Sequence, residues 1–197
     1  MSCSKTQKRE LKKRELVDSA LLTLAKLGYA RASLRDIAKQ CGVSVGVIHY
    51  YFEDKDELIK HCVLIYKEQF LDKIQRVVTE AATYDELIEG FFDQLVTAVA
   101  DDAESHRLWY DIRSQALFEP ALQTIVADIE NAMIAQLQEV LQRINALGKD
   151  TGKVNHLNFY LLLESHFRYW LQKKLCEGDM DAPAKMKQAL YASVCWD

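Results

Sequence analysis

The residues best suited to chemistry lie in one short stretch, CGVSVGVIHYYFEDKDEL at positions 41–58. It places His49, Tyr50 and Tyr51 side by side, and Lys55 follows four residues after Tyr51. Imidazole, phenol and ammonium groups all donate hydrogen bonds, and phosphate oxygens are strong acceptors for them. This stretch therefore suits a surface that contacts phosphate.

Catalytic and metal-binding patterns are not visible in the rest of the sequence. An enzyme needs a nucleophile, a base and an orienting group that converge, and His106 and His166 stand alone. The cysteines lack the spacing of zinc ligands; they are Cys3, Cys41, Cys62, Cys176 and Cys195. We expect reduced, mostly buried thiols, with a redox-sensing role for one of them left open. We predict a protein that is not an enzyme and that holds neither a metal nor a cofactor.

The elements around the opening stretch are short helices joined by a tight turn. Ser33 begins SLRD, a start similar to a capping box, and Gly42 ends the helix that follows. Ser44 can then cap a helix of about two turns that ends near Phe52. A helix, a tight turn with glycine and a second helix make the geometry of a helix-turn-helix DNA-binding unit.

The next helix start also points to a phosphate. Asp54 and Glu57 can cap it reciprocally, yet Lys55 stands at the first helical position, where the helix dipole disfavours a cation. A DNA phosphate would compensate, because it pairs with the ammonium and accepts from the free amides of the first turn. A solvated surface lysine is the other interpretation, and the neighbouring turn favours the phosphate.

Charge is distributed unevenly along the chain. Residues 1–60 hold 12 Lys and Arg against 8 Asp and Glu, a net charge of +4. Since the whole chain has a net charge of −4, residues 61–197 have a net charge of −8. A basic front suggests that a polyanion meets only the N-terminal part, although such a difference also occurs on solvated surfaces. Six of the cations lie at positions 5–14. This basic arm either contacts DNA or is a disordered tail.

Composition and periodicity predict an all-α fold. The 197 residues include only 2 prolines and 7 glycines, and apolar residues recur at spacings of three and four. The expected helices cover residues 8–27, 33–41, 44–52, 55–78, 84–100, 104–117, 120–147, 154–176 and 183–195. No apolar run reaches the length of a membrane span, and no apolar segment follows the basic start. We therefore expect a cytoplasmic protein with no membrane partner.

Residues 21–59, LLTLAKLGYARASLRDIAKQCGVSVGVIHYYFEDKDELI, resemble the N-terminal DNA-binding domain of the TetR/AcrR family of one-component transcriptional regulators. The likeness lies in Gly28-Tyr29, SLRDIAKQCGVS, Gly46, YYF and DKDEL, and it covers about a fifth of the chain. It implies a helix-turn-helix DNA-binding domain at 1–54 and a helical effector-binding and dimerisation domain at 55–197, joined by the long helix that begins at Lys55.

The resemblance also implies which residues meet DNA: Ser33, Arg35, Ser44, Val45, Gly46, Val47, His49, Tyr50, Tyr51 and Lys55. Ser33 either caps a helix and touches phosphate or only caps, and Arg35 either contacts phosphate or is merely exposed. Tyr51 is expected to pack against a neighbouring helix more than to read bases. The family commonly has a tyrosine at the position of His49, where an imidazole can still donate to phosphate.

Aromatic and polar residues in the second half mark a possible effector site, with Phe91, Trp109, Arg113, Phe118, Phe159 and His166 as candidates. Each aromatic is equally explained as core, and an ion pair with Glu164 or Glu119 explains Arg113 as well as a ligand does. The resemblance implies a dimer interface built by the last two helices as a four-helix bundle. Leu157, Leu161, Glu164, Arg168, Leu171, Leu190 and Val194 suit it.

Together with these patterns, the resemblance implies a homodimeric transcriptional regulator. We expect a repressor that is released from a near-palindromic operator in double-stranded DNA by an unknown small-molecule effector bound in the C-terminal domain. The alternative is a helical ligand carrier or interaction protein whose DNA-binding domain is vestigial. DNA binding with a steep salt dependence would distinguish the two.

Overall fold

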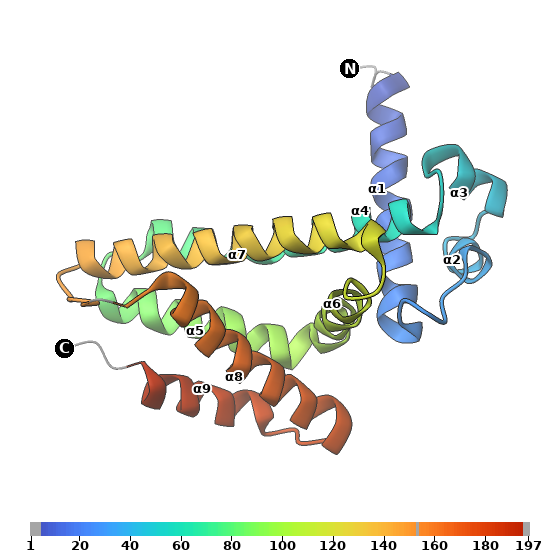
Figure 1. The fold of residues 1–197 in the computed structure, drawn as a ribbon. Coiled ribbons are helices and arrows are strands. Elements are labelled where there is room, and N and C mark those ends of the chain that lie inside the picture. Colours follow the sequence, from blue (N-terminus) through green and yellow to red (C-terminus); the bar gives the residue numbers. More distant parts are fainter. Residues whose placement is uncertain (1–4, 153, 195–197) are drawn as a thin grey trace. The chain divides into compact units, whose positions relative to one another are not determined.

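The computed structural model describes residues 5–152 and 154–194, and within these ranges it contains nine α-helices and no strand (Figure 1). The helices are α1 (Lys5–Leu27), α2 (Leu34–Gln40), α3 (Val45–Tyr51), α4 (Lys55–Glu80), α5 (Tyr84–Asp101), α6 (Ala103–Gln115), α7 (Pro120–Ala146), α8 (His156–Glu177) and α9 (Ala182–Ser193). The predicted all-α fold is confirmed. The end of the last predicted helix, at residue 195, lies outside the described residues.

Local capping interactions explain several helix starts. The Ser33 hydroxyl accepts from the Asp36 amide at 3.2 Å, and the Asp36 carboxylate accepts from the Ser33 amide at 2.9 Å, which completes a capping box before α2. Thr83 accepts from the Glu86 amide at 3.2 Å before α5. These contacts satisfy amides that have no partner inside the helix.

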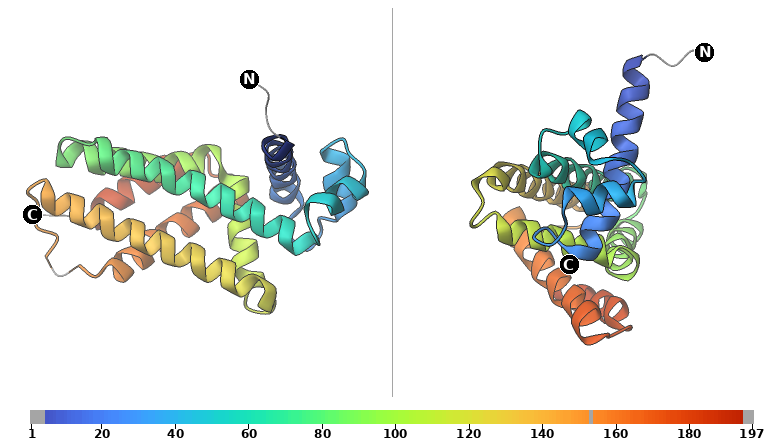
Figure 2. Two further views of the ribbon diagram at one scale, coloured as in Figure 1. Left: turned by 90° about the horizontal axis from the view of Figure 1, so that it is seen from above. Right: turned by 90° about the vertical axis from the view of Figure 1, so that its right-hand side faces the viewer.

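Packing divides the chain into two compact units. The first unit contains residues 1–67 and 104–126, and therefore α1, α2, α3, most of α6 and the beginnings of α4 and α7. Within it α2 packs against both α1 and α3, as both views in Figure 2 show. Its core is apolar and includes Leu16, Ala20, Leu24, Ile37, Ile48, Phe52, Leu58, Ile59 and Ile112.

The second unit contains residues 68–103 and 127–197. Here α5, α8 and α9 pack pairwise, and Figures 1 and 2 show α8 and α9 side by side. Phe91 is fully buried, with its ring centroid 5.8 Å from that of Phe92 and 6.4 Å from that of Phe159. The contact between Phe91 and Phe159 joins α5 to α8 through an apolar core.

The two units are defined by packing and not by function. Residues of α4 and of α7 contribute to both, because the unit boundaries fall after residues 67 and 126. The functional division at residue 54 inferred from the sequence stays a prediction. Within the described ranges, no helix has both the length and the apolar character needed to cross a bilayer.

The described cysteines differ in exposure. Cys62 is buried, Cys41 is half-buried and Cys176 is exposed, so the expectation of mostly buried thiols holds for the first two only. Burial raises the pKa of the Cys62 and Cys41 thiols, which disfavours the reactive thiolate at both. Cys3 and Cys195 lie outside the described residues.

Candidate DNA interface

Helix α3 is anchored by one face and leaves the other exposed. Ile48 and Phe52 have exposed fractions of 0% and 1%, so they fix the helix and its C-terminal end to the core of the first unit. The opposite side of the same stretch carries the exposed residues Ser44, Gly46, His49 and Tyr50, with Val45, Val47 and Tyr51 half-buried. The residues inferred to meet DNA thus gather on the side of α3 that the core does not use.

The Tyr50 ring stands next to the basic start of α1. It is 67% exposed, and the Arg9 guanidinium carbon lies 5.8 Å from its centroid. Tyr51 meets the Tyr50 ring edge-on, with 4.9 Å between centroids. Positions 5–14 are helical, so the interpretation of this segment as a disordered tail is wrong. A positive charge and an aromatic hydroxyl therefore adjoin each other on one surface.

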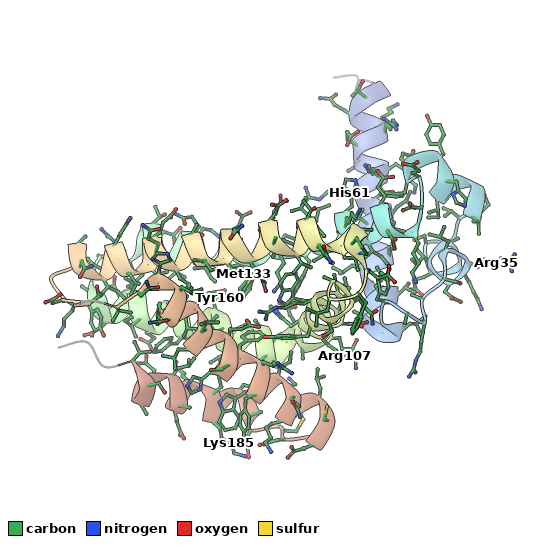
Figure 3. All side chains as sticks on the ribbon, viewed as in Figure 1. Arg35, His61, Arg107, Met133, Tyr160 and Lys185 are labelled. Atoms are coloured by element: carbon green, nitrogen blue, oxygen red, sulfur yellow. The ribbon has the colours of Figure 1, made fainter. Side chains whose placement is uncertain are left out.

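The start of α2 differs in detail from the expectation. The Ser33 hydroxyl donates to Asp36 Oδ2 at 2.5 Å, so its hydrogen is already in use, and this contact lowers the pKa of Asp36. A phosphate at this point would take its hydrogen bonds from other groups, such as Arg35, which is exposed and projects from α2 (Figure 3). Ser44 occupies the N-cap position of α3, but its hydroxyl caps no amide. The predicted side-chain cap is therefore wrong.

Substitution of Gly46 is expected to change protein stability and DNA affinity in opposite directions. A Cβ added there would meet only Ser44 Oγ, at an ordinary 3.7 Å. We expect Gly46→Ala to raise the free energy of unfolding by about 0.5–1 kcal/mol, because alanine is the better helix former. The same methyl group would hold the backbone away from DNA and weaken binding. Thermal unfolding and a DNA titration measure the two effects.

Gly90 in α5 provides the contrast for this prediction. Its added Cβ would lie 2.9 Å from Val77 Cγ1, closer than side chains tolerate, so Gly90→Ala is expected to lower stability and leave the DNA surface intact. A Gly46→Ala variant that binds DNA as well as the wild-type protein would contradict a close approach of the α3 backbone.

The start of α4 is capped much as expected. The Glu57 amide donates to Asp54 Oδ1 at 2.8 Å, while Glu57 Oε2 accepts from the amide of Glu53 instead of that of Asp54, at 2.5 Å. Lys55 is half-buried, and its Nζ donates to the Tyr29 carbonyl oxygen at 2.5 Å. Sequence reasoning missed Tyr29, which already offsets part of the unfavourable position of Lys55 on the helix dipole.

His61 joins α1 to α4 near this site (Figure 3). Lys13 Nζ lies 2.9 Å from His61 Nε2, and Glu57 Oε1 lies 3.7 Å from the same nitrogen. Burial lowers the pKa of His61, and the Lys13 ammonium lowers it further, against the opposing effect of Glu57 and Glu10. The folded chain therefore favours the neutral imidazole.

This lowered pKa predicts a pH-dependent stability. The unfolded chain takes up the proton first, so the contribution of His61 is complete above its ordinary pKa of about 6.5 and is lost as the pH falls toward the folded value. We expect the stability advantage of the wild-type protein over His61→Gln to shrink between about pH 7.5 and about pH 5.5. Thermal unfolding of both chains measures it, and an advantage that is constant with pH would contradict the assignment.

The candidate effector residues do not form one group. Phe91 and Phe159 contact each other in the core of the second unit. His166 of the same unit is half-buried, and its Nε2 lies 3.1 Å from Ser193 Oγ outside that core. Trp109 belongs to the first unit and is 1% exposed. Arg113 is half-buried. Phe118 is 80% exposed, so its expected place in an enclosed pocket is wrong, because the turn after α6 leaves its ring in solvent.

Trp109 is buried together with polar groups. Its Nε1 is buried and has no hydrogen-bond partner among the described residues, and Lys67 Nζ lies 4.6 Å from the ring centroid. Lys67 is itself only 2% exposed. The indole face is thus occupied by a cation of the chain, a contact that desolvation strengthens.

The residues inferred for the dimer interface separate by exposure. Leu157 and Leu161 are 44% and 51% exposed, Arg168 is exposed and Glu164 is half-buried. Three others face the core of their own protomer and cannot lie on an exposed interface: Leu171, Leu190 and Val194. Tyr169, which is 53% exposed, lies eight residues after Leu161 on α8 and so shares its side of the helix.

The sequence of this chain is similar to those of known regulatory proteins. Residues 16–62 match the family described as bacterial regulatory proteins, tetR family. The HTH-type transcriptional regulator BetI of Cronobacter sakazakii (strain ATCC BAA-894) is 29% identical over 118 residues, which are 57% of this chain and 56% of that protein. The chain thus spans about half the length of this curated relative. In the described residues, no group of His, Cys, Asp and Glu has the arrangement of a metal site.

Two solved structures share the fold over almost the whole chain. A transcriptional regulator from Saccharomonospora viridis in complex with choline has a TM-score of 0.79 and 15% identity, covering 93% of this chain and 95% of that one. The transcriptional regulator FadR from Bacillus subtilis in complex with stearoyl-CoA has a TM-score of 0.76 and 18% identity, covering 92% and 99%. At these identities the likeness shows the fold alone.

Proposed function

We propose that this chain, whose residues 16–62 match the tetR family of bacterial regulatory proteins, is a DNA-binding transcriptional repressor of that type released by a small molecule. The observation that carries the proposal is α3, a short helix whose buried face anchors it and whose exposed face bears His49, Tyr50 and Gly46. Such a helix fits the major groove, because its side-chain tips are polar and Gly46 lets the backbone approach closely.

The proposed DNA surface comprises Ser33, Arg35, Ser44, Val45, Gly46, Val47, His49, Tyr50, Tyr51 and Lys55. Arg9 joins it, since its guanidinium lies against Tyr50. Phosphate contacts by Arg9, Arg35 and Lys55 would orient the domain, while the valines offer only apolar contact to bases. Discrimination between sequences then depends on Ser44, His49, Tyr50 and DNA shape.

The effector site is proposed for the helical region at 55–197. Two neighbours in fold hold choline and stearoyl-CoA, which supports a small-molecule site in such a fold. The effector favours a conformation with lower operator affinity, and its effect equals its differential affinity for the two conformations.

A homodimer with a near-palindromic operator completes the proposal. The exposed side chains of Leu157, Leu161 and Tyr169 on α8 provide an apolar stripe for a second copy. Two protomers would set their α3 helices about 34–36 Å apart, one turn of DNA. A protein acting on the chromosome in this way works in the cytoplasm.

Selection of bound fragments from fragmented genomic DNA of the source organism tests the proposal. The purified chain should enrich a small set of fragments that share an inverted repeat, and a duplex carrying that repeat is called the operator duplex below. Enrichment of no sequence would favour the alternative, a helical ligand carrier whose DNA-binding domain is vestigial.

A further inference from the structure

Tyr29, in the turn between α1 and α2, is held by two helices that are distant in sequence. Its amide donates to Asp111 Oδ2 of α6 at 2.6 Å. Its carbonyl oxygen accepts from Lys55 Nζ of α4 at 2.5 Å, and its hydroxyl donates to Asp56 Oδ1 of α4 at 3.0 Å. All of these residues belong to the first unit. Tyr29 therefore connects α6 to the first turn of α4.

The Tyr29 ring adds to the hold on Lys55. The ammonium lies 4.7 Å from the ring centroid, within range of a cation–π interaction. Burial and the hydrogen bond to Asp56 raise the pKa of Tyr29 to about 12, so the hydroxyl stays protonated and keeps donating. The carbonyl and the ring of one residue thus fix the position of the Lys55 ammonium.

A second contact from α6 secures the end of α1. Arg107 Nη2 donates to the carbonyl oxygen of Ala25 at 2.6 Å, in the last turn of α1 (Figure 3). Carbonyls in a last turn have no partner within the helix, and a cation there is favoured by the helix dipole. Arg107 and Asp111 are four residues apart and so share one face of α6. They hold the chain on both sides of Gly28.

Gly28 is required for this approach. Its φ of +80° lies in the left-handed region, and a Cβ added there would lie 3.0 Å from Asp111 Oδ2. The neighbouring cleft of about 370 Å³ is lined by this turn and by α6, including Arg31, Arg107 and Asp111. A side chain at position 28 would therefore crowd the Asp111 carboxylate that accepts from the Tyr29 amide.

We propose that Arg107 and Asp111 form a latch on the end of α1 that positions Tyr29, and that Tyr29 in turn positions Lys55 to meet a DNA phosphate. The inference rests on the proposed function and adds a residue-level control of the same DNA surface. Lysine has three N–H donors, of which the Tyr29 carbonyl takes one, so a held ammonium can still donate to phosphate. A fixed cation binds more tightly than a mobile one, because less side-chain entropy is lost on binding.

The latch is tested by titrating the operator duplex with the Asp111→Ala and Asp111→Asn variants and measuring binding by fluorescence anisotropy. We expect Asp111→Ala to bind about ten-fold more weakly, the effect of a charge-assisted hydrogen bond. Asp111→Asn keeps an acceptor oxygen for the Tyr29 amide and should restore most of the affinity. The slope of log affinity against log salt should fall by about one in Asp111→Ala, as when one phosphate contact is lost.

A double variant separates positioning from general damage. If the latch acts through Lys55, adding Asp111→Ala to Lys55→Ala should weaken binding no further than Lys55→Ala alone. Gly28→Ala should reproduce the Asp111→Ala defect. Gly148→Ala is its matched control, because Gly148 has a φ of +87° and no atom within 4 Å of an added Cβ. It carries the same backbone strain and should bind DNA as the wild-type protein does.

The outcomes separate the inference from the proposed function. If the wild-type protein binds the operator duplex and Asp111→Ala binds it equally well, the latch is overturned and the proposed function stands. The same holds if the losses in Asp111→Ala and Lys55→Ala add in the double variant. Failure of the wild-type protein to bind any selected duplex would overturn both. Circular dichroism on each variant confirms that a loss of affinity is not a loss of fold.

Discussion

Replacing Tyr50 and Lys55 together by alanine abolishes specific DNA binding in our account while the chain stays folded. Tyr50 is 67% exposed and Lys55 is half-buried, so neither side chain belongs to the core. A charge-assisted hydrogen bond and a second polar contact together correspond to a loss of about a hundredfold or more in affinity. Anisotropy titration of the operator duplex measures the loss, and thermal unfolding monitors the fold.

Single variants show where this loss originates. Tyr50→Phe keeps the ring beside Arg9 and removes only the hydroxyl, so it should bind more tightly than Tyr50→Ala. Lys55→Ala also loses the contact to the Tyr29 carbonyl, which lowers stability by about 1 kcal/mol at most. If the double variant bound the operator duplex with wild-type affinity, the assignment of the DNA surface to α3 and the start of α4 would be wrong.

Phe91→Ala is expected to produce the largest loss of stability. The side chain is fully buried in the second unit, between the rings of Phe92 and Phe159. Truncating a buried phenylalanine removes apolar contacts and leaves a cavity, which lowers the free energy of unfolding by about 3–5 kcal/mol. Urea denaturation followed by circular dichroism measures the change.

Phe118→Ala is the matched control for Phe91→Ala. The chemical change is identical, but the Phe118 ring is 80% exposed, so the free energy of unfolding should change by no more than about 0.5 kcal/mol. Equal losses in the two variants would contradict the burial described for α5.

Local signals explain why the helices were predictable from sequence. The Thr83 hydroxyl accepts from the Glu86 amide, and the Glu86 carboxylate accepts from the Ala82 amide, so residues within one turn of each other determine the start of α5. Gly178 adopts a φ of 70° at the end of α8, a conformation that glycine reaches without strain. The Ser44 cap failed although its position was right, because the position does not decide which way a hydroxyl turns.

Exposure was less predictable, because periodicity defines a helix face and not what covers it. Phe91 lies in α5 and Phe118 in the turn after α6, so the same residue type is core in one place and solvent-exposed in the other. Leu171 and Leu190 fit the apolar pattern expected of an interface, but both are buried where α8 and α9 pack within the protomer. A sequence pattern does not separate these two uses of leucine.

The long-range contacts around Tyr29, next to the proposed DNA surface, could not be predicted from the sequence. Lys55 and its partner Tyr29 are 26 positions apart, and Tyr29 and Asp111 are 82 apart. No spacing rule joins such residues, because the chain between them must fold first. The Gly28-Tyr29 pair was visible in the sequence, but its physical reason, the approach of Asp111, became clear only in the fold.

The most direct test of the central claim is a titration of the purified protein against the operator duplex and against a scrambled duplex of the same composition, at several salt concentrations. We predict a preference for the operator of about a thousandfold or more, with affinity for both duplexes falling steeply as salt increases. Equal affinity for the two duplexes, or binding that salt does not weaken, would contradict the claim that this protein is a sequence-specific DNA-binding regulator.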